Sequence, residues 1–261
     1  MTWTTRPRSE LSGLAAITVG KGPRVLLLHG VGLRAESWGA QLESIRAAHH
    51  VIAPDLPGHG HSPALGNSQP DLADYTTTLA KLLSSPTIVI GHSFGALLAL
   101  TLAAHHPEKV SSVVALNAIF RRSPAAKTAV QTRLANLQET ATSDPTDTLT
   151  RWFGTQDSAA RRACHTWLMQ ANPRGYKAAY SVFAHEDGPS DSTLHRVRCP
   201  AFFVTGSEEP NSTPTMSHQM AQMVPQGEAV VIAGAAHMMP MTHATALDPV
   251  LHRALKAGLC Q

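Results

Sequence analysis

Residues 87–105 read TIVIGHSFGALLALTLAAH, in which a β-branched run, a glycine-bounded turn and an apolar segment follow one another without a break. Thr87–Ile90 has the length and composition of a buried strand. Phe94–His105 is apolar on nearly every face and is followed by Pro107, so we expect a buried helix that ends before the proline. The stretch therefore predicts a strand, a tight turn and a helix.

The turn is Gly91-His92-Ser93-Phe94-Gly95, which matches G-x-S-x-G, the strand-to-helix turn that lifts a serine hydroxyl above a sheet. The glycines let the chain turn tightly around a residue held in a strained backbone conformation. A pentapeptide of this kind also arises by chance, and only its setting between a strand and a helix gives it weight. We predict that Ser93 is a nucleophile, which then needs a base and an acid downstream.

Further apolar runs on both sides of this stretch predict the rest of a sheet. The runs are Val25–Leu28, Val51–Ala53, Val113–Leu116, Ala201–Val204 and Ala229–Ile232. Continuous apolar runs bounded by Gly, Pro or Asp are typical of parallel strands covered on both faces. With a closing helix at about Pro249–Ala257, the pattern predicts an α/β fold with a doubly wound, mostly parallel sheet.

The region between the two groups of strands has a different character. It contains helical stretches with polar breaks and no convincing strand run. We therefore expect a core domain formed by residues 1–118 and 196–261, interrupted by a helical insertion at residues 119–195. We call residues 119–195 the cap.

His237 is the predicted base among the 15 histidines of the chain. It follows the strand Ala229–Ile232 in a loop of small residues. His243 is its rival, but it follows Pro240 and is expected on or near the closing helix. For His92, and for His59 and His61 in an earlier loop, capping or solvation is the expected role.

The acid is expected on the loop after Ala201–Val204, in the chain order serine, acid, histidine. That loop reads Thr205-Gly206-Ser207-Glu208-Glu209-Pro210. Glu209 stands three residues after the glycine and is the favoured acid, while Glu208 is expected to be a solvated loop charge. Both Glu208 and Asn117 stay open as alternatives.

Cleavage of an ester also requires two N–H donors for the negative oxygen of the tetrahedral intermediate. One is expected from Phe94, directly after the nucleophile. The other is expected from Val31, in the glycine-rich turn His29-Gly30-Val31-Gly32 that follows Val25–Leu28. A packed turn without this role is the alternative.

Composition narrows the classes of partner. The 21 basic and 18 acidic residues give a net charge of +3 and are scattered, so no nucleic acid is expected. Leu14–Val19 is too short for a signal peptide, and no run approaches the roughly 18 apolar residues of a membrane span. No metal is expected, because His59-x-His61 lacks further ligands.

The three cysteines point to a compartment. Cys164, Cys199 and Cys260 are odd in number and far apart, and none forms a C-x-x-C pair. A reducing compartment is the simplest interpretation, so we expect a cytoplasmic protein.

Together, the turn at Ser93, the glycine-rich turn at Val31, the loop Asp55–Ser62 and the loop Gly234–Pro240 resemble the α/β-hydrolase family over about residues 20–257. The chain looks like its small capped members, which include 3-oxoadipate enol-lactonases and other carboxylic-ester hydrolases. The resemblance implies a serine acyl-enzyme mechanism without a cofactor.

By this resemblance Ser93 attacks the carbonyl, His237 takes its proton, and the acid at Glu209 orients the imidazole. Most relatives carry Asp at the acid position, and this chain departs from them there. Serine at position 93 argues against the dehalogenase and epoxide hydrolase branches, which place Asp at that turn.

The expected substrate is a small-molecule ester or lactone, and the sequence leaves the oligomeric state open. Two alternatives remain: a carbon–carbon bond hydrolase of ring-cleavage products, and a ligand receptor of the same fold with weak turnover. Arg34, Arg174 and Lys177 are candidates to hold a substrate carboxylate, although solvated side chains are the favoured interpretation.

Overall fold

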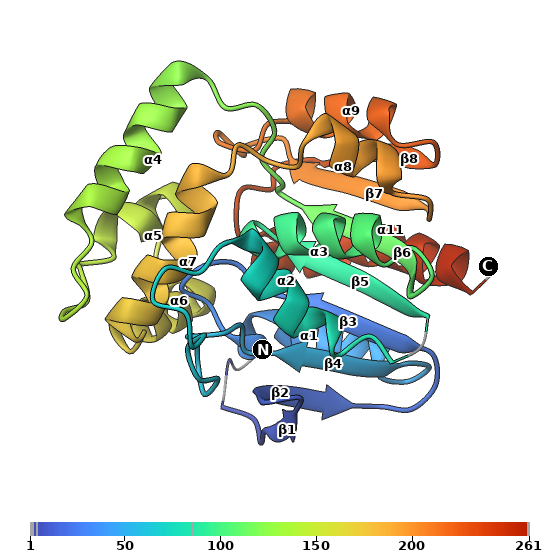
Figure 1. Ribbon diagram of the computed structural model, residues 1–261. Coiled ribbons are helices and arrows are strands. Elements are labelled where there is room, and N and C mark those ends of the chain that lie inside the picture. The colour runs from blue at the N-terminus through green and yellow to red at the C-terminus, as the bar shows by residue number, and fades with distance from the viewer. Residues whose placement is uncertain (1–2, 4, 85, 260–261) are drawn as a thin grey trace.

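The computed structural model describes residues 3, 5–84 and 86–259, and Cys260 lies outside them. The strands form one eight-stranded sheet in the order β1-β2-β4-β3-β5-β6-β7-β8 (Figure 1). Their bounds are β1 Ser9–Leu11, β2 Leu14–Val19, β3 Arg24–Leu28, β4 His50–Pro54, β5 Thr87–His92, β6 Val110–Leu116, β7 Ala201–Gly206 and β8 Gly227–Ile232. From β4 to β8 all neighbouring strands are parallel, and β1 and β2 add an antiparallel edge.

Helices cover both faces of the sheet, which confirms the predicted doubly wound α/β class. The helices are η1 Ala35–Trp38, α1 Gly39–Ile45, α2 Leu72–Ala80, α3 Phe94–His105, α4 Pro124–Asn136, α5 Thr146–Phe153, α6 Ala159–Met169, α7 Pro173–His185, α8 Asp191–Arg196, α9 Pro214–Met223, α10 Met239–Thr242 and α11 Ala244–Gly258. α2, α3, α8 and α9 lie on one face, and α1 and α11 lie on the other (Figure 1).

The alternation of side chains along each strand divides the apolar residues between two cores. In β3, Leu26 and Leu28 belong to the core beneath α3, whereas Val25 and Leu27 belong to the core beneath α11. Both faces of the strand are thus buried, which explains its unbroken apolar run.

The predicted central strands are all present, and α3 has the predicted bounds. The prediction for the closing helix was wrong at its start, because α11 begins at Ala244 and Pro249 lies inside it. Leu247 is already buried in the core, so the helix is anchored before the proline, and the missing proline N–H costs one hydrogen bond in its second turn. The short polar strand β1 was not predicted.

All the helices between β6 and β7, from α4 to α8, fall within or at the end of residues 119–196, and the described part of this region contains no strand. α4 to α7 gather at the edge of the sheet where the parallel strands end (Figure 1). Among the described residues, no helix is long and apolar enough to cross a membrane.

α7 touches the loop after β4 main chain to main chain. Gly58 in that loop has φ +77°, and Gly175 in α7 faces it. A Cβ atom at Gly175 would lie 2.2 Å from the carbonyl oxygen of Gly58, which is far too close. Glycine on both sides therefore permits this contact.

Candidate active site

Ser93 stands between the end of β5 and the start of α3, with φ 56° and ψ −117°. Residues other than glycine rarely adopt this backbone conformation, and contacts with the surrounding structure must offset its strain energy. Two glycines make the turn possible, since a Cβ at Gly91 would lie 2.0 Å from the Gly95 carbonyl oxygen and one at Gly95 would lie 2.1 Å from that of Leu28. The Ser93 N–H donates to the Leu116 carbonyl oxygen at 2.8 Å.

Glu209 and His237 form a hydrogen-bonded pair. His237 Nδ1 donates to Glu209 Oε2 at 2.7 Å, and the carboxyl group is completely buried. A neutral imidazole with its proton on Nδ1 leaves Nε2 as the basic nitrogen, which is the tautomer that a general base needs. Glu208 is exposed and accepts a hydrogen bond from Ser207, while His243 caps α11 and contacts Thr242.

The electrostatics of Glu209 favour its charged form. Burial alone would raise the pKa of this carboxyl group, but the neighbouring His237 and the N–H groups of Asn211 and Ser212 hold the pKa down, to about 2. Its Oε1 atom accepts from these N–H groups at 2.8 and 3.4 Å. The carboxylate is therefore fixed by donors on both of its oxygen atoms.

The backbone of His237 is held by two side chains. His92 Nε2 and Asn117 Nδ2 each donate to its carbonyl oxygen, both at 2.7 Å. The rings of His92 and His237 lie 4.9 Å apart. The loop that carries His237 is thus attached to the ends of β5 and β6, next to Ser93.

The expectation that His92 and His59 serve as caps or are solvated was wrong, because both are buried. Burial lowers the pKa of His92 to about 3 and also lowers the pKa of His59, whose Nδ1 donates to the Pro57 carbonyl oxygen. The fold places these imidazoles in the interior as neutral donors. Within the described residues, no three His, Cys, Asp or Glu side chains are grouped to hold a metal ion.

The loop expected to supply the second oxyanion donor runs beside Ser93. A Cβ atom at Gly30 would lie 3.2 Å from Ser93 Cβ, and Val31 is the next residue. His29 fixes this loop, since its Nε2 accepts from the Leu56 N–H at 2.9 Å and its Nδ1 donates to the Gly30 carbonyl oxygen at 2.8 Å. On the other side, Phe94 is the first residue of α3, where helix N–H groups lack acceptors within the helix.

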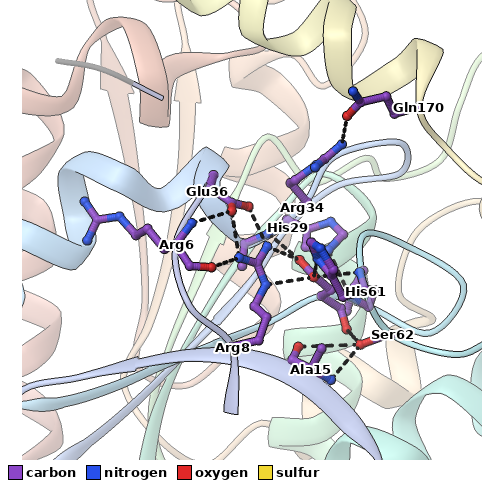
Figure 2. Close-up of polar contacts among 12 residues, drawn as sticks. Arg6, Arg8, Ala15, His29, Arg34, Glu36, His61, Ser62 and Gln170 are labelled. Atoms are coloured by element: carbon purple, nitrogen blue, oxygen red, sulfur yellow. Dashed lines mark hydrogen bonds and ion pairs between the residues drawn. The ribbon is translucent and has the colours of Figure 1, made fainter. Parts of the chain in front are cut away.

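A buried ionic network supports this loop from below (Figure 2). Arg8 forms two hydrogen bonds with Glu36, at 2.6 and 2.7 Å, and two with Asp55, at 3.0 and 3.2 Å. Asp55 also accepts from the N–H groups of Ala35 and His61. Although burial opposes it, these partners hold the pKa of Asp55 below its ordinary value. The network thereby joins the N-terminal segment to the loops after β3 and β4.

Side chains from the cap cover His237 and the glycine-rich turn at Gly32. The ring of Trp152 in α5 stacks on that of His237 at 5.6 Å. Leu168 of α6 and Tyr176 of α7 occupy the space in front of Gly32, each 2.6 Å from the position of a Cβ there. The site is therefore covered by apolar and aromatic groups.

The basic residues singled out from the sequence already have partners. Arg34 donates to Gln170 at 3.0 Å and lies over the ring of Trp167. Arg174 and Lys177 lie 3.8 and 3.5 Å from Glu139. The roles of His92 and Asn117 as donors to the His237 carbonyl oxygen were not predicted. Asn117, an alternative for the acid, was marked only by its position at the end of a predicted strand.

Comparison with known proteins agrees with this architecture. The model of the Alpha/beta hydrolase family matches residues 25–249. The chain is 36% identical to (E)-2-((N-methylformamido)methylene)succinate hydrolase of Acinetobacter baylyi, over 85% of this chain and 86% of that protein. It is 30% identical to the pimeloyl-[acyl-carrier protein] methyl ester esterase of Chromobacterium violaceum, over 87% and 91%.

A solved structure shows the same fold. The enol-lactonase from Burkholderia xenovorans LB400 superposes with a TM-score of 0.84 at 20% identity, over 96% of this chain and all of that one (100%). The family match spans most of the chain and includes both the turn at Ser93 and the loop at His237. The chain therefore belongs to the alpha/beta hydrolase family.

Proposed function

We propose that this protein is a serine hydrolase that cleaves a carboxylic ester or lactone of a small molecule through an acyl-enzyme. The observation that carries the proposal is the Glu209–His237 pair, in which His237 Nδ1 lies 2.7 Å from Glu209 Oε2. That pair is attached, through His92 and Asn117, to the strand ends beside the strained Ser93.

In the proposed reaction Ser93 Oγ attacks the substrate carbonyl carbon while His237 Nε2 takes the hydroxyl proton. The N–H groups of Val31 and Phe94 bind the oxyanion of the tetrahedral intermediate. Its collapse breaks the bond to the leaving group, which receives the proton from His237. Water then attacks the acyl-enzyme by the same route and regenerates Ser93.

Similarity to a methyl ester esterase supports an ester, and similarity to the hydrolase of a formamido compound favours an amide as the second candidate. Both bonds are cleaved through the same tetrahedral chemistry, so the same residues would serve either substrate. The proposed compartment is the cytosol, supported by two buried thiols, Cys164 and Cys199, that form no disulfide.

A fluorophosphonate probe and short p-nitrophenyl esters test the proposal together, on the wild type and on Ser93→Ala. We expect labelling at Ser93 alone, together with ester turnover that Ser93→Ala abolishes. A folded protein that is neither labelled nor active on esters or amides would contradict the proposal and favour a receptor.

A further inference from the structure

Arg133 of α4 is a half-buried cation without an ion-pair partner among the described residues. Its Nη2 donates to the Tyr176 hydroxyl at 2.9 Å, and its guanidinium lies 5.3 Å from the centre of the Tyr180 ring. Its Nε is buried and has no hydrogen-bond acceptor. Buried donors are almost always paired, so this one calls for an explanation.

A second guanidinium lies near the first. Arg151 of α5 makes one long hydrogen bond, to Thr148 Oγ1 at 3.4 Å, and it too has no ion-pair partner within the described ranges. Partial burial and the charge of Arg133 lower its pKa, while Tyr180, Asp147 and Tyr176 act the other way. The positive charge of Arg133 therefore acts on Arg151, an exposed residue at which Asp147 offsets part of the repulsion.

The partners of both arginines line one cavity. Its volume is about 40 Å³, and its walls include Arg133, Thr148, Leu168 and Tyr176 but not Arg151. Asp144 also lines it, and its carboxylate accepts two hydrogen bonds from Thr146. One water molecule needs roughly 10–15 Å³ of such space, so the cavity accepts a small polar group such as a carboxylate. Thr148 connects it to Arg151, and Tyr176 is the partner of Arg133.

One wall of this cavity is also the roof of the candidate active site. Leu168 and Tyr176 face the cavity and contact Gly32, the residue after Val31. Trp152, which follows Arg151 in α5, stacks on His237. The cavity thus lies across Leu168 and Tyr176 from the turn at Gly32.

We propose that Arg133 and Arg151 bind a carboxylate of the substrate, so that the natural substrate is an ester or amide with an anionic group remote from the scissile carbonyl. The inference rests on the proposed function of the Ser93 site. A carboxylate accepts paired hydrogen bonds from a guanidinium, and it would also neutralise the repulsion between the two cations. The Tyr176 hydroxyl, which accepts from Arg133, keeps its own proton to donate to the same group.

Two esters of equal length test the charge requirement. Mono-p-nitrophenyl glutarate carries a carboxylate at the end where p-nitrophenyl pentanoate carries a methyl group. We expect the wild type to prefer the glutarate ester in kcat/KM. Arg133→Met or Arg151→Met should lower that preference about tenfold or more, mainly through KM, because each removes a charged hydrogen-bond donor.

Two further variants serve as controls. Arg162→Met removes an exposed arginine of α6 that pairs with Asp157, and it should leave the preference unchanged. Arg133→Lys keeps the charge without the planar fork and should retain part of the preference. An unchanged preference in folded Arg133→Met and Arg151→Met would overturn the inference, as would a loss of preference caused by Arg174→Met instead.

Binding of glutarate to Ser93→Ala, measured by calorimetry, separates the two proposals. Weaker glutarate binding in Ser93→Ala/Arg133→Met than in Ser93→Ala supports the anion site even if no ester is ever cleaved. If the pentanoate ester is cleaved and neither arginine substitution changes the glutarate preference, the serine hydrolase is supported and the anion site is rejected.

Discussion

The side chain of His92, the residue before Ser93, donates through Nε2 to the backbone carbonyl oxygen of His237 at 2.7 Å. The sequence separates the two histidines by 145 positions, and the sheet brings them together. Any displacement of the strand end that carries Ser93 is thereby passed to the loop that carries the proposed base. Asn117 reinforces this link from the end of β6.

Loss of either donor should slow the reaction without preventing folding. We expect His92→Phe and Asn117→Gly each to lower kcat on a p-nitrophenyl ester by about fivefold, since one hydrogen bond is worth about 1 kcal/mol. Glycine is the proper replacement at 117, because Asn117 has φ 51° and alanine would add strain. Since the donors share one acceptor, the double variant should lose less than the product of the two effects. Equal rates in wild type and both variants would contradict this positioning role.

The acid at Glu209 should matter far more than its neighbour. In Glu209→Gln the amide no longer stabilises the imidazolium, and we expect kcat to fall by about a thousandfold or more. Glu208→Gln alters an exposed group whose partner is Ser207 and should stay within about twofold of wild type. Steady-state kinetics on one ester compare the two variants. A larger loss in Glu208→Gln would reverse the assignment of the acid.

The strained backbone at Ser93 predicts a conflict between stability and activity. Ser93→Gly and Ser93→Ala both lack the proposed nucleophile and should be inactive. Glycine relieves the strain of φ 56°, whereas alanine keeps it, so Ser93→Gly should be more stable by about 1 kcal/mol once its greater unfolded-state entropy is included. Urea unfolding measures the difference. Greater stability of the alanine variant would mean that the turn is unstrained.

Buried neutral histidines should make the protein sensitive to mild acid. Burial is the chief reason that the pKa values of His29 and His92 fall from 6.5 to about 3. Between these two pH values the unfolded chain therefore binds more protons than the folded chain. Stability is therefore fully present above pH 6.5 and falls towards pH 3, by about 1.4 kcal/mol per pH unit for each histidine. The low pKa of Glu209, about 2, adds a loss only below its ordinary value of 4.5.

Urea unfolding of the wild type and His92→Asn at pH 7.5 and 5.5 tests this effect. The variant should lose less stability between the two values of pH, because one of the titrating groups is gone. The exposed His252 provides the control, and His252→Asn should follow the wild type. A wild type equally stable at both values would show that the histidines are protonated in the folded state.

Arg8 should be essential to the fold although it lies far from Ser93 in sequence. Arg8→Met would leave Glu36 and Asp55 buried without their cation, which typically costs about 3–5 kcal/mol. Arg46→Met, which removes an exposed pair with Glu43, should cost no more than about 1 kcal/mol. The free energy of unfolding in urea distinguishes them. Equal costs would show that the network is solvated.

Local patterns were sufficient to predict the central strands, because each is buried on both faces and reads as an unbroken apolar run. The start of α11 was not predictable in this way, since the burial of Leu247 outweighs the local effect of Pro249. The turn at Ser93 was visible because its glycines are required by main-chain contacts within a few residues and with β3. Local sequence patterns therefore predicted where the central strands and the turn at Ser93 stand in the fold.

Contacts between distant segments lie beyond such patterns. The burial of His92 depends on a loop that follows it in the chain only after ten further strands and helices. The contact of Arg133 with Tyr176 depends on how α4 packs against α7. Nothing near either residue in the chain distinguishes it from a solvated one. Arg34, for which a solvated side chain was the favoured interpretation, instead attaches the loop after β3 to α6.

The contact between Gly58 and Gly175 sets the distance between α7 and the loop after β4. Two main chains touch there without any intervening side chain, so the height of α7 above the sheet is set by the peptide units themselves. A single methyl group at either position would wedge the two segments apart and lift Tyr176 from Gly32. Substitution at this one point is therefore expected to widen the space in front of Gly32, beside the candidate active site.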